Sequence, residues 1–153
     1  GNLSGEDTRE RTKGVEEVAA AHPGIKILDK QTALFFRKEA NDVTTNWLLS
    51  GQDINAIVAN NDEMAIGAIL ALKQAGQKDI LVAGIDGTPD ALQFVEQGEL
   101  NVTIFQDAKG QGDGAVQSAI ALVKGQKVEQ TVLIPYQMIT KDNYQDFAKR
   151  NVR

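Results

Sequence analysis

Cysteine is absent from this chain of 153 residues, and histidine occurs only once. The chain therefore has no disulfide and no thiolate metal site, and one imidazole argues against a transition-metal centre. No apolar run approaches the roughly 20 residues of a membrane-spanning helix, and no charged-then-apolar leader is present. The 16 Lys and Arg residues are scattered and the net charge is −5. Because phosphate binding needs a clustered positive field, nucleic acid is not the expected partner.

Helical and strand patterns alternate along the chain, whose length suits one domain with a real core. The expected helices cover residues 8–21, 37–49, 62–75, 89–97, 110–124 and 141–149, and the expected strands cover residues 25–28, 56–59, 80–83, 101–105 and 131–136. This alternation predicts an α/β fold with a parallel sheet that has helices on both faces. The chain opens on a strand-to-helix loop, so we expect a strand upstream and a fragment of a larger protein.

Two polar segments follow expected strands and precede expected helices. Residues 60–63 read Asn-Asn-Asp-Glu after the strand at 56–59, and residues 84–90 read Gly-Ile-Asp-Gly-Thr-Pro-Asp after the strand at 80–83. Ligands of open α/β sheets bind at the carboxyl edge of the strands. The spacing therefore places amides and carboxylates side by side where a ligand is expected.

The chain lacks residues that a catalytic or cofactor-binding interpretation of its motifs would require. Residues 84–88 are similar to the Asp-x-Asp-Gly-Thr signature of haloacid-dehalogenase-type phosphatases, but Gly84 stands where the nucleophilic Asp is required. The glycines at 110–114 do not have the spacing of a dinucleotide-binding loop. Asp62 and Glu63 could hold a hard cation, but their favourable interaction with a helix N-terminus is a sufficient explanation. We expect no cofactor, no metal and no enzymatic activity.

The polar residues expected at this carboxyl edge, called the rim below, suit a polyol. The adjacent hydroxyls of a polyol both donate and accept hydrogen bonds. Carboxylates accept from neighbouring hydroxyls, Arg donates in a planar fork, amides do both, and an aromatic ring stacks on a C–H face. The candidate residues for these roles are Arg9, Asn61, Asp86, Gln106, and Phe35 or Phe36. Because no nucleophile and base accompany them, the pattern predicts binding without reaction.

The chain resembles the C-terminal lobe of ribose-type (type I) periplasmic sugar-binding proteins of ABC transporters over nearly its whole length. The segments that carry the resemblance are Thr-Arg-Glu-Arg at 8–11 with Gly14, Ala-Ala-Ala-His at 19–22, residues 61–68, residues 84–90 and Thr-Ile-Phe-Gln at 103–106. The resemblance implies that Arg9, Asn61, Asp86 and Gln106 contact a sugar. It also implies an aromatic contact, which is Phe35 if the family pattern is anchored on Arg37 and Phe36 if it is anchored on Leu48-Leu49; we favour Phe35.

The resemblance implies a division of the chain as well. Residues 1–106 form the core of the lobe, the helix at 110–124 packs on an N-terminal lobe absent from this sequence, and residues 131–153 return through the hinge and form the tail. The expected partners are a monosaccharide or polyol, the missing lobe, a membrane permease and, for the fragment, a second copy. The expected location is the periplasm, or the outer surface of a Gram-positive cell with a lipid anchor.

Two other functions remain open at this stage. One is the effector-sensing domain of a LacI-type repressor, although Lys78-Asp79-Ile80 and residues 84–87 favour a sugar-binding protein of a transporter over a repressor. The other is an enzyme on a flavodoxin-like sheet.

Overall fold

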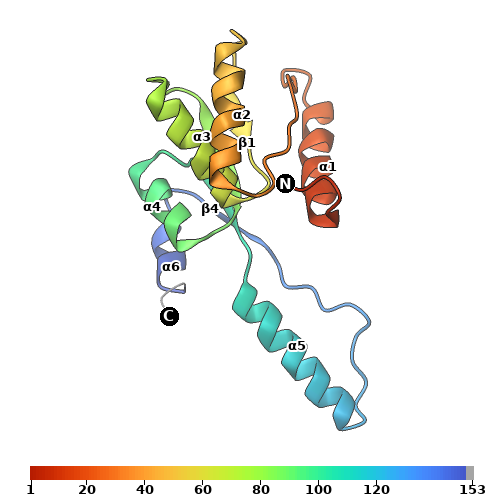
Figure 1. Ribbon diagram of the computed structural model, residues 1–153. Helices are drawn as coiled ribbons and strands as arrows, with labels where there is room; N and C mark the ends of the chain where they lie inside the picture. Colours follow the sequence, from red (N-terminus) through yellow and green to blue (C-terminus); the bar gives the residue numbers. More distant parts are fainter. Residues whose placement is uncertain (151–153) are drawn as a thin grey trace.

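Helices and strands alternate along most of the chain, as the sequence predicts. The computed structural model describes residues 1–150. The helices are α1 (Glu6–Ala21), α2 (Arg37–Leu49), α3 (Asp62–Gln74), α4 (Pro89–Gln97), α5 (Ala108–Val123) and α6 (Tyr144–Ala148), and the strands are β1 (Ala56–Val58), β2 (Leu81–Asp86), β3 (Val102–Phe105) and β4 (Gln137–Ile139) (Figure 1).

The strands form one sheet in the order β1-β2-β3-β4. β1 pairs with β2 and β2 with β3 in parallel, whereas β4 runs antiparallel to β3. The predicted α/β class with a mainly parallel sheet is therefore confirmed. The three parallel strands end at one edge, so the loops that follow them meet there.

The core lies between the sheet and the helices α2, α3 and α4. Along β1 and β2, Ile57 and Val82 are buried, whereas Val58 and Leu81 point to the opposite face and are 52% and 56% exposed. Helix α3 is buried on most sides and packs closely against α2. A side chain at Gly67 would overlap the carbonyl oxygen of Arg37, so this close approach requires glycine there.

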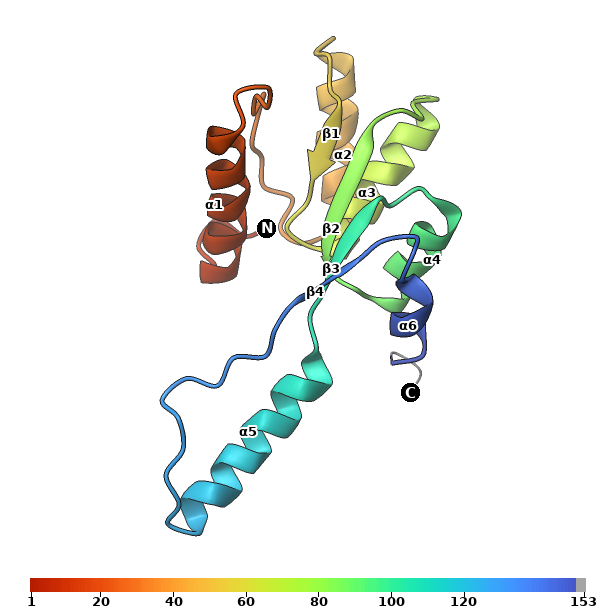
Figure 2. The same ribbon diagram turned by 180° about the vertical axis from the view of Figure 1, so that it is seen from behind.

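Two predicted strands are wrong. Residues 25–28 and residues 131–136 belong to irregular segments, and the strand expected at 131–136 forms instead at β4. Residues 25–28 run between α1 and the edge strand β1 without pairing to a strand, and Ile25 and Leu28 are 53% and 43% exposed (Figure 2). An apolar run becomes a strand only where a neighbouring strand accepts its hydrogen bonds. The sequence pattern cannot supply that neighbour.

Helix α5 and residues 124–136 extend away from the rest of the molecule (Figures 1 and 2). No residue of α5 is buried, although Val116, Ile120 and Val123 repeat at helical spacing. In the facing irregular segment Leu133 is 83% exposed. Such an apolar stripe is typical of a helix that packs on another part of a protein.

Candidate functional site

Three loops meet at the carboxyl edge of the sheet and carry the polar residues of the candidate site. Asn60 and Asn61 follow β1, Asp86 ends β2, and Gln106 follows β3. Asp86 pairs with Phe105 in the β2–β3 ladder, and the backbone N–H of Gln106 donates to the carbonyl oxygen of Asp86 at 3.0 Å. The parallel sheet thus brings together residues, from Asn60 to Gln106, that are up to 46 positions apart in the sequence.

Asp86 occupies an unusual position. Its φ of 133° lies in a region that residues other than glycine rarely adopt, so the surrounding structure holds a strained backbone. Its side chain is 30% exposed. Burial, and then the negative charge of Asp62, raise the pKa of Asp86 to about 6, although the Arg11 guanidinium acts in the opposite direction. A half-buried, strained carboxylate is typical of a functional position.

Arg11, rather than the predicted Arg9, joins the rim residues. Its Nη1 donates to the carbonyl oxygen of Asn60 at 2.7 Å, and its Nη2 donates to Oε1 of Gln106 at 3.0 Å. Nη1 also lies 3.8 Å from Oδ1 of Asp86. Asn60 also holds the loop after β1 against α1, because its Nδ2 donates to Oγ1 of Thr12 at 3.0 Å. The guanidinium therefore links the loops that follow all three parallel strands.

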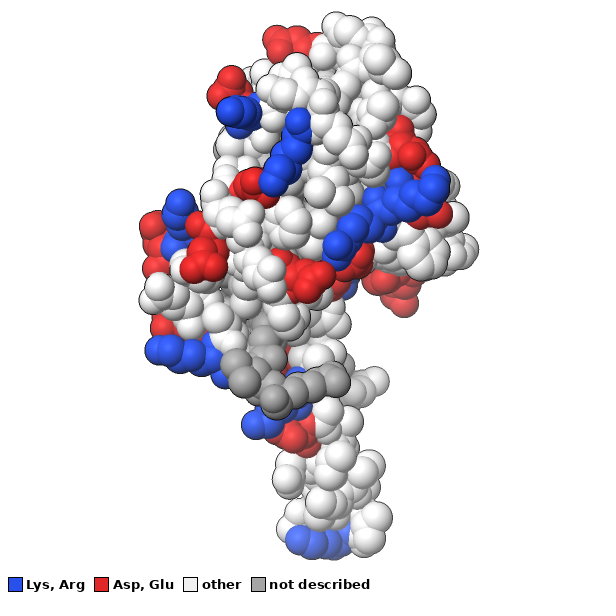
Figure 3. Space-filling model, turned by 60° about the vertical axis from the view of Figure 1, so that its left-hand side comes forward, with Lys and Arg blue, Asp and Glu red and all other residues white. Residues whose placement is uncertain are grey.

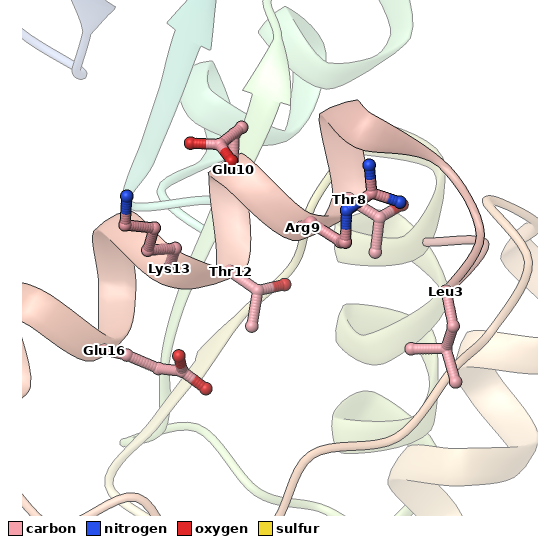
Figure 4. Close-up of a pocket in the computed structure, with 7 residues that line it drawn as sticks. All are labelled: Leu3, Thr8, Arg9, Glu10, Thr12, Lys13 and Glu16. Carbon is pink, nitrogen blue, oxygen red and sulfur yellow. The ribbon is translucent and has the colours of Figure 1, made fainter.

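Arg9 lies elsewhere on α1. It is exposed, and its Nη1 donates to the carbonyl oxygen of Ser4 at 2.9 Å. It borders an open hollow of about 440 Å³, as Figure 4 shows, whose other lining residues are Leu3, Thr8, Glu10, Thr12, Lys13 and Glu16. Neither Asp86 nor Gln106 lines this hollow. The structure therefore does not bring Arg9 to the other predicted site residues.

The helical period of α1 is the sequence signal that favours Arg11 over Arg9 as the rim residue. Val15 is a partly buried apolar residue of α1, and Arg11 precedes it by four residues, about one turn. Thr8, three residues before Arg11, is buried on the same face. Arg9 precedes Val15 by six residues, about a third of a turn away from the side of α1 that carries Thr8, Arg11 and Val15.

Asn61 lies at the predicted rim, but its side chain already has structural partners. As the N-cap of α3, its Oδ1 accepts from the backbone N–H of Met64 at 3.0 Å, and its Nδ2 donates to the carbonyl oxygen of Phe35 at 3.4 Å. Asn61 is 9% exposed. Its capping role is thus visible in the structure, and its contact with a sugar stays a prediction.

The two candidate aromatics differ in their surroundings. Phe35 packs partly buried against the core and has a φ of 68°, next to Leu34 at 52°. Phe36 is the N-cap of α2 and is 60% exposed. Immediately after them, Arg37 donates to both carboxylate oxygens of Glu63 at 2.9 and 2.7 Å, which ties the start of α2 to α3. The pair therefore sits on a fixed turn beside Asn61.

The described residues hold no group of three or more His, Cys, Asp or Glu side chains arranged to bind a metal ion. Within residues 1–150, no helix is both long enough and apolar enough to cross a membrane. On the face drawn in Figure 3, basic and acidic side chains are interspersed. The polar rim is therefore the strongest candidate site in the part of the chain that the structure describes.

Comparison with known proteins identifies the class of this fold. Residues 1–127 match the periplasmic binding protein domain, and the chain belongs to this family. The structure superposes with a TM-score of 0.92 on an ABC transporter solute-binding protein of Bacillus halodurans with bound myo-inositol; the two are 44% identical over 98% of this chain and 52% of that one.

Two further relatives have named ligands. A protein of Rhizobium meliloti named as rhizopine-binding is 46% identical over 99% of this chain and 50% of its own length. The ribose import binding protein of Escherichia coli is 38% identical over 87% of this chain and 45% of its own length. The chain thus spans about half the length of the curated relatives that it matches.

Proposed function

We propose that this chain is the C-terminal lobe of a solute-binding component of a bacterial ABC importer, which binds a monosaccharide or polyol between two lobes and delivers it to a permease. The observation that carries the proposal is the junction at the carboxyl edge of the sheet, where Arg11 contacts both Asp86 and Gln106. The names of the relatives, which include ribose, xylitol and rhizopine binding, support this function over the repressor alternative.

The chemistry of the junction fits a ligand that has adjacent hydroxyls. The carboxylate of Asp86 can accept from two of them, while Arg11 and the amide of Gln106 donate to ring or hydroxyl oxygens. Phe35 or Phe36 supplies an aromatic face for the C–H side of the ligand, with Phe35 favoured. Asn61 contributes through the second hydrogen of its Nδ2, since the first is donated to the carbonyl oxygen of Phe35. Binding replaces water around the half-buried Asp86 with these fixed donors and hydroxyls.

The rest of the site belongs to a second lobe in this proposal. The relatives are about twice as long, and the face of α5 with Val116, Ile120 and Val123 suits a surface contributed by the other half. Residues 1–106 then form the lobe core, and α5, predicted at 110–124, packs on the N-terminal lobe. Residues 131–150 return through the hinge; the last three residues of the predicted tail lie outside the described part of the chain. The assembled protein works in the periplasm, or on the outer surface of a Gram-positive cell through a lipid anchor.

A panel of polyols tests the proposal in the protein with both lobes. Calorimetry with myo-inositol, D-ribose, xylitol and D-allose should give stoichiometric binding of at least one of them without turnover. Asp86→Ala should abolish that binding, because it removes the acceptor for bound hydroxyls and costs at least ~2 kcal/mol. Unchanged affinity in Asp86→Ala would refute the site, and chemical conversion of a bound sugar would favour the enzyme alternative.

The two arginines of α1 provide a matched pair of variants for the same assay. Arg11→Gln should weaken binding strongly, because it removes the guanidinium that reaches Asp86 and Gln106. Arg9→Gln changes an exposed side chain two residues away and should leave the affinity within about twofold, the range of weak surface interactions. The reverse result would restore Arg9 as the ligand contact.

A further inference from the structure

Asp62, the first residue of α3, is the only acidic side chain among the buried polar residues of the described chain, with no exposed surface. Each of its carboxylate oxygens has a donor. Oγ1 of Thr103 donates to Oδ1 at 2.6 Å, and the backbone N–H of Thr88 donates to Oδ2 at 2.8 Å. A buried carboxylate is strongly unfavourable unless such donors satisfy it. These bonds therefore fix where the Asp62 side chain lies.

The same bonds fix the turn that follows β2. Thr103 Oγ1 also accepts from the backbone N–H of Gly87 at 3.3 Å, so Asp62 holds Thr88 directly, and it holds Gly87 both through Thr103 and through the Gly87 backbone N–H. Both residues come immediately after Asp86, whose φ of 133° requires such support. Asp62 also packs tightly against β2, since a Cβ at Gly84 would stand 2.5 Å from Oδ1 of Asp62.

We propose that Asp62 is a positioning residue of the ligand site, which holds the turn at 86–88 so that the carboxylate of Asp86 faces Arg11 and the bound polyol. This inference rests on the proposed function for the identity of the ligand. It assigns Asp62 no contact with the ligand. Glu63, its neighbour, pairs instead with Arg37 on the surface, so the two adjacent carboxylates have different roles.

Asp62 also acts on the charge of Asp86. The charged groups that face Asp86 are Asp7 and Arg11 from α1 and Asp62 from α3; the two carboxylates raise the pKa of Asp86 and the guanidinium lowers it, after burial as the largest cause. A neutral residue at position 62 should therefore lower the pKa of Asp86. A residue that only filled space in the core would not change this titration.

The first experiment needs no ligand. Carboxyl-carbon NMR titrations of the wild type and Asp62→Asn, with the Asp86 signal assigned through Asp86→Asn, should show a lower pKa of Asp86 in Asp62→Asn. Amide hydrogen exchange at Thr88 should become at least about tenfold faster in Asp62→Asn, as loss of a hydrogen bond to a charged acceptor implies. An unchanged Asp86 pKa together with unchanged exchange at Thr88 would overturn the proposal.

The second experiment uses a pair of substitutions at Thr103, which also decides the matter if Asp62→Asn does not fold. Thr103→Val removes the hydroxyl at nearly constant shape, whereas Thr103→Ser keeps it. In the protein with both lobes, affinity for myo-inositol or D-ribose should fall at least about tenfold in Thr103→Val and stay within about threefold of wild type in Thr103→Ser. Equal affinities in folded Val and Ser variants would refute the positioning role. If neither probe binds the wild type, the choice of ligand in the proposed function is wrong, and exchange at Gly87 and Thr88 in the Val and Ser variants still tests Asp62.

Discussion

The raised pKa of Asp86 predicts that its charge destabilises the fold at neutral pH. The pKa rises from 3.8 to about 6, so between these values the folded chain holds more protons than the unfolded chain. The free energy of unfolding contributed by this group therefore falls as the pH rises from about 4 to about 6, and it stays low above that range. Asp86→Asn removes this cost and replaces the carboxylate with an uncharged amide of nearly the same shape.

The magnitude follows from the two pKa values. At about 1.4 kcal/mol for each tenfold change in proton affinity, the full difference corresponds to about 3 kcal/mol. Because the side chain is 30% exposed, solvent screening reduces this figure, and we expect about 1–2 kcal/mol at pH 7.5. For a chain of this size that is a rise in Tm of roughly 2–8 °C.

Urea unfolding at pH 7.5 and pH 3.5 measures the effect. Asp86→Asn should be more stable than the wild type at pH 7.5, and the two should be nearly equal at pH 3.5. The exposed Asp79, changed to Asn, controls for the loss of one negative charge from an acidic chain and should shift stability by less than about 0.5 kcal/mol. A destabilised Asp86→Asn at pH 7.5, or a gain that persists at pH 3.5, would refute the reasoning.

Three other predictions concern packing and surfaces. Gly67→Ala should lower the free energy of unfolding by about 1–3 kcal/mol, because the new methyl overlaps Arg37, whereas Gly14→Ala in open space on α1 should raise it by up to about 1 kcal/mol, as urea unfolding will report. Phe35→Leu should weaken polyol binding in calorimetry more than Phe36→Leu does; the opposite order would select Phe36 as the stacking ring. Val116→Ser with Ile120→Ser should reduce self-association of the isolated chain in sedimentation velocity, and unchanged association would mean that the α5 face is not its contact.

The positions of the helices and of the ligand edge could be predicted from the sequence because they depend on local signals. Thr88 caps α4, Pro89 occupies its first turn, and Gly98 ends it in a left-handed conformation, as such residues do. Asp86 and Gln106 follow strands that are recognisable by their apolar runs. Parallel pairing then places both residues at one edge without further information.

The parts that could not be predicted depend on neighbours distant in the chain. Residues 25–28 have a strand pattern but no adjacent strand, and β4 pairs beside β3 six residues after the predicted start of a strand at 131. Arg9 and Arg11 lie in the same motif; the helical period favours Arg11, but its partner Asn60 is 49 residues away and only the structure shows that contact. The sequence places Asp62 only in the first turn of a helix, because nothing in it reveals Thr103 as the partner of Asp62.

The pairing of β3 with β4 has a mechanical consequence. The chain leaves the sheet after Phe105 and re-enters at Gln137, and these two residues face each other in the antiparallel ladder. If α5 packs on a second lobe, as proposed, two chain segments that lie next to each other connect that lobe to the sheet, and adjacent connections of this kind suit rotation better than sliding. Gln106, at the start of the first segment, is also bonded to Arg11. The residue beside the first of these two segments is therefore also a residue of the candidate ligand site.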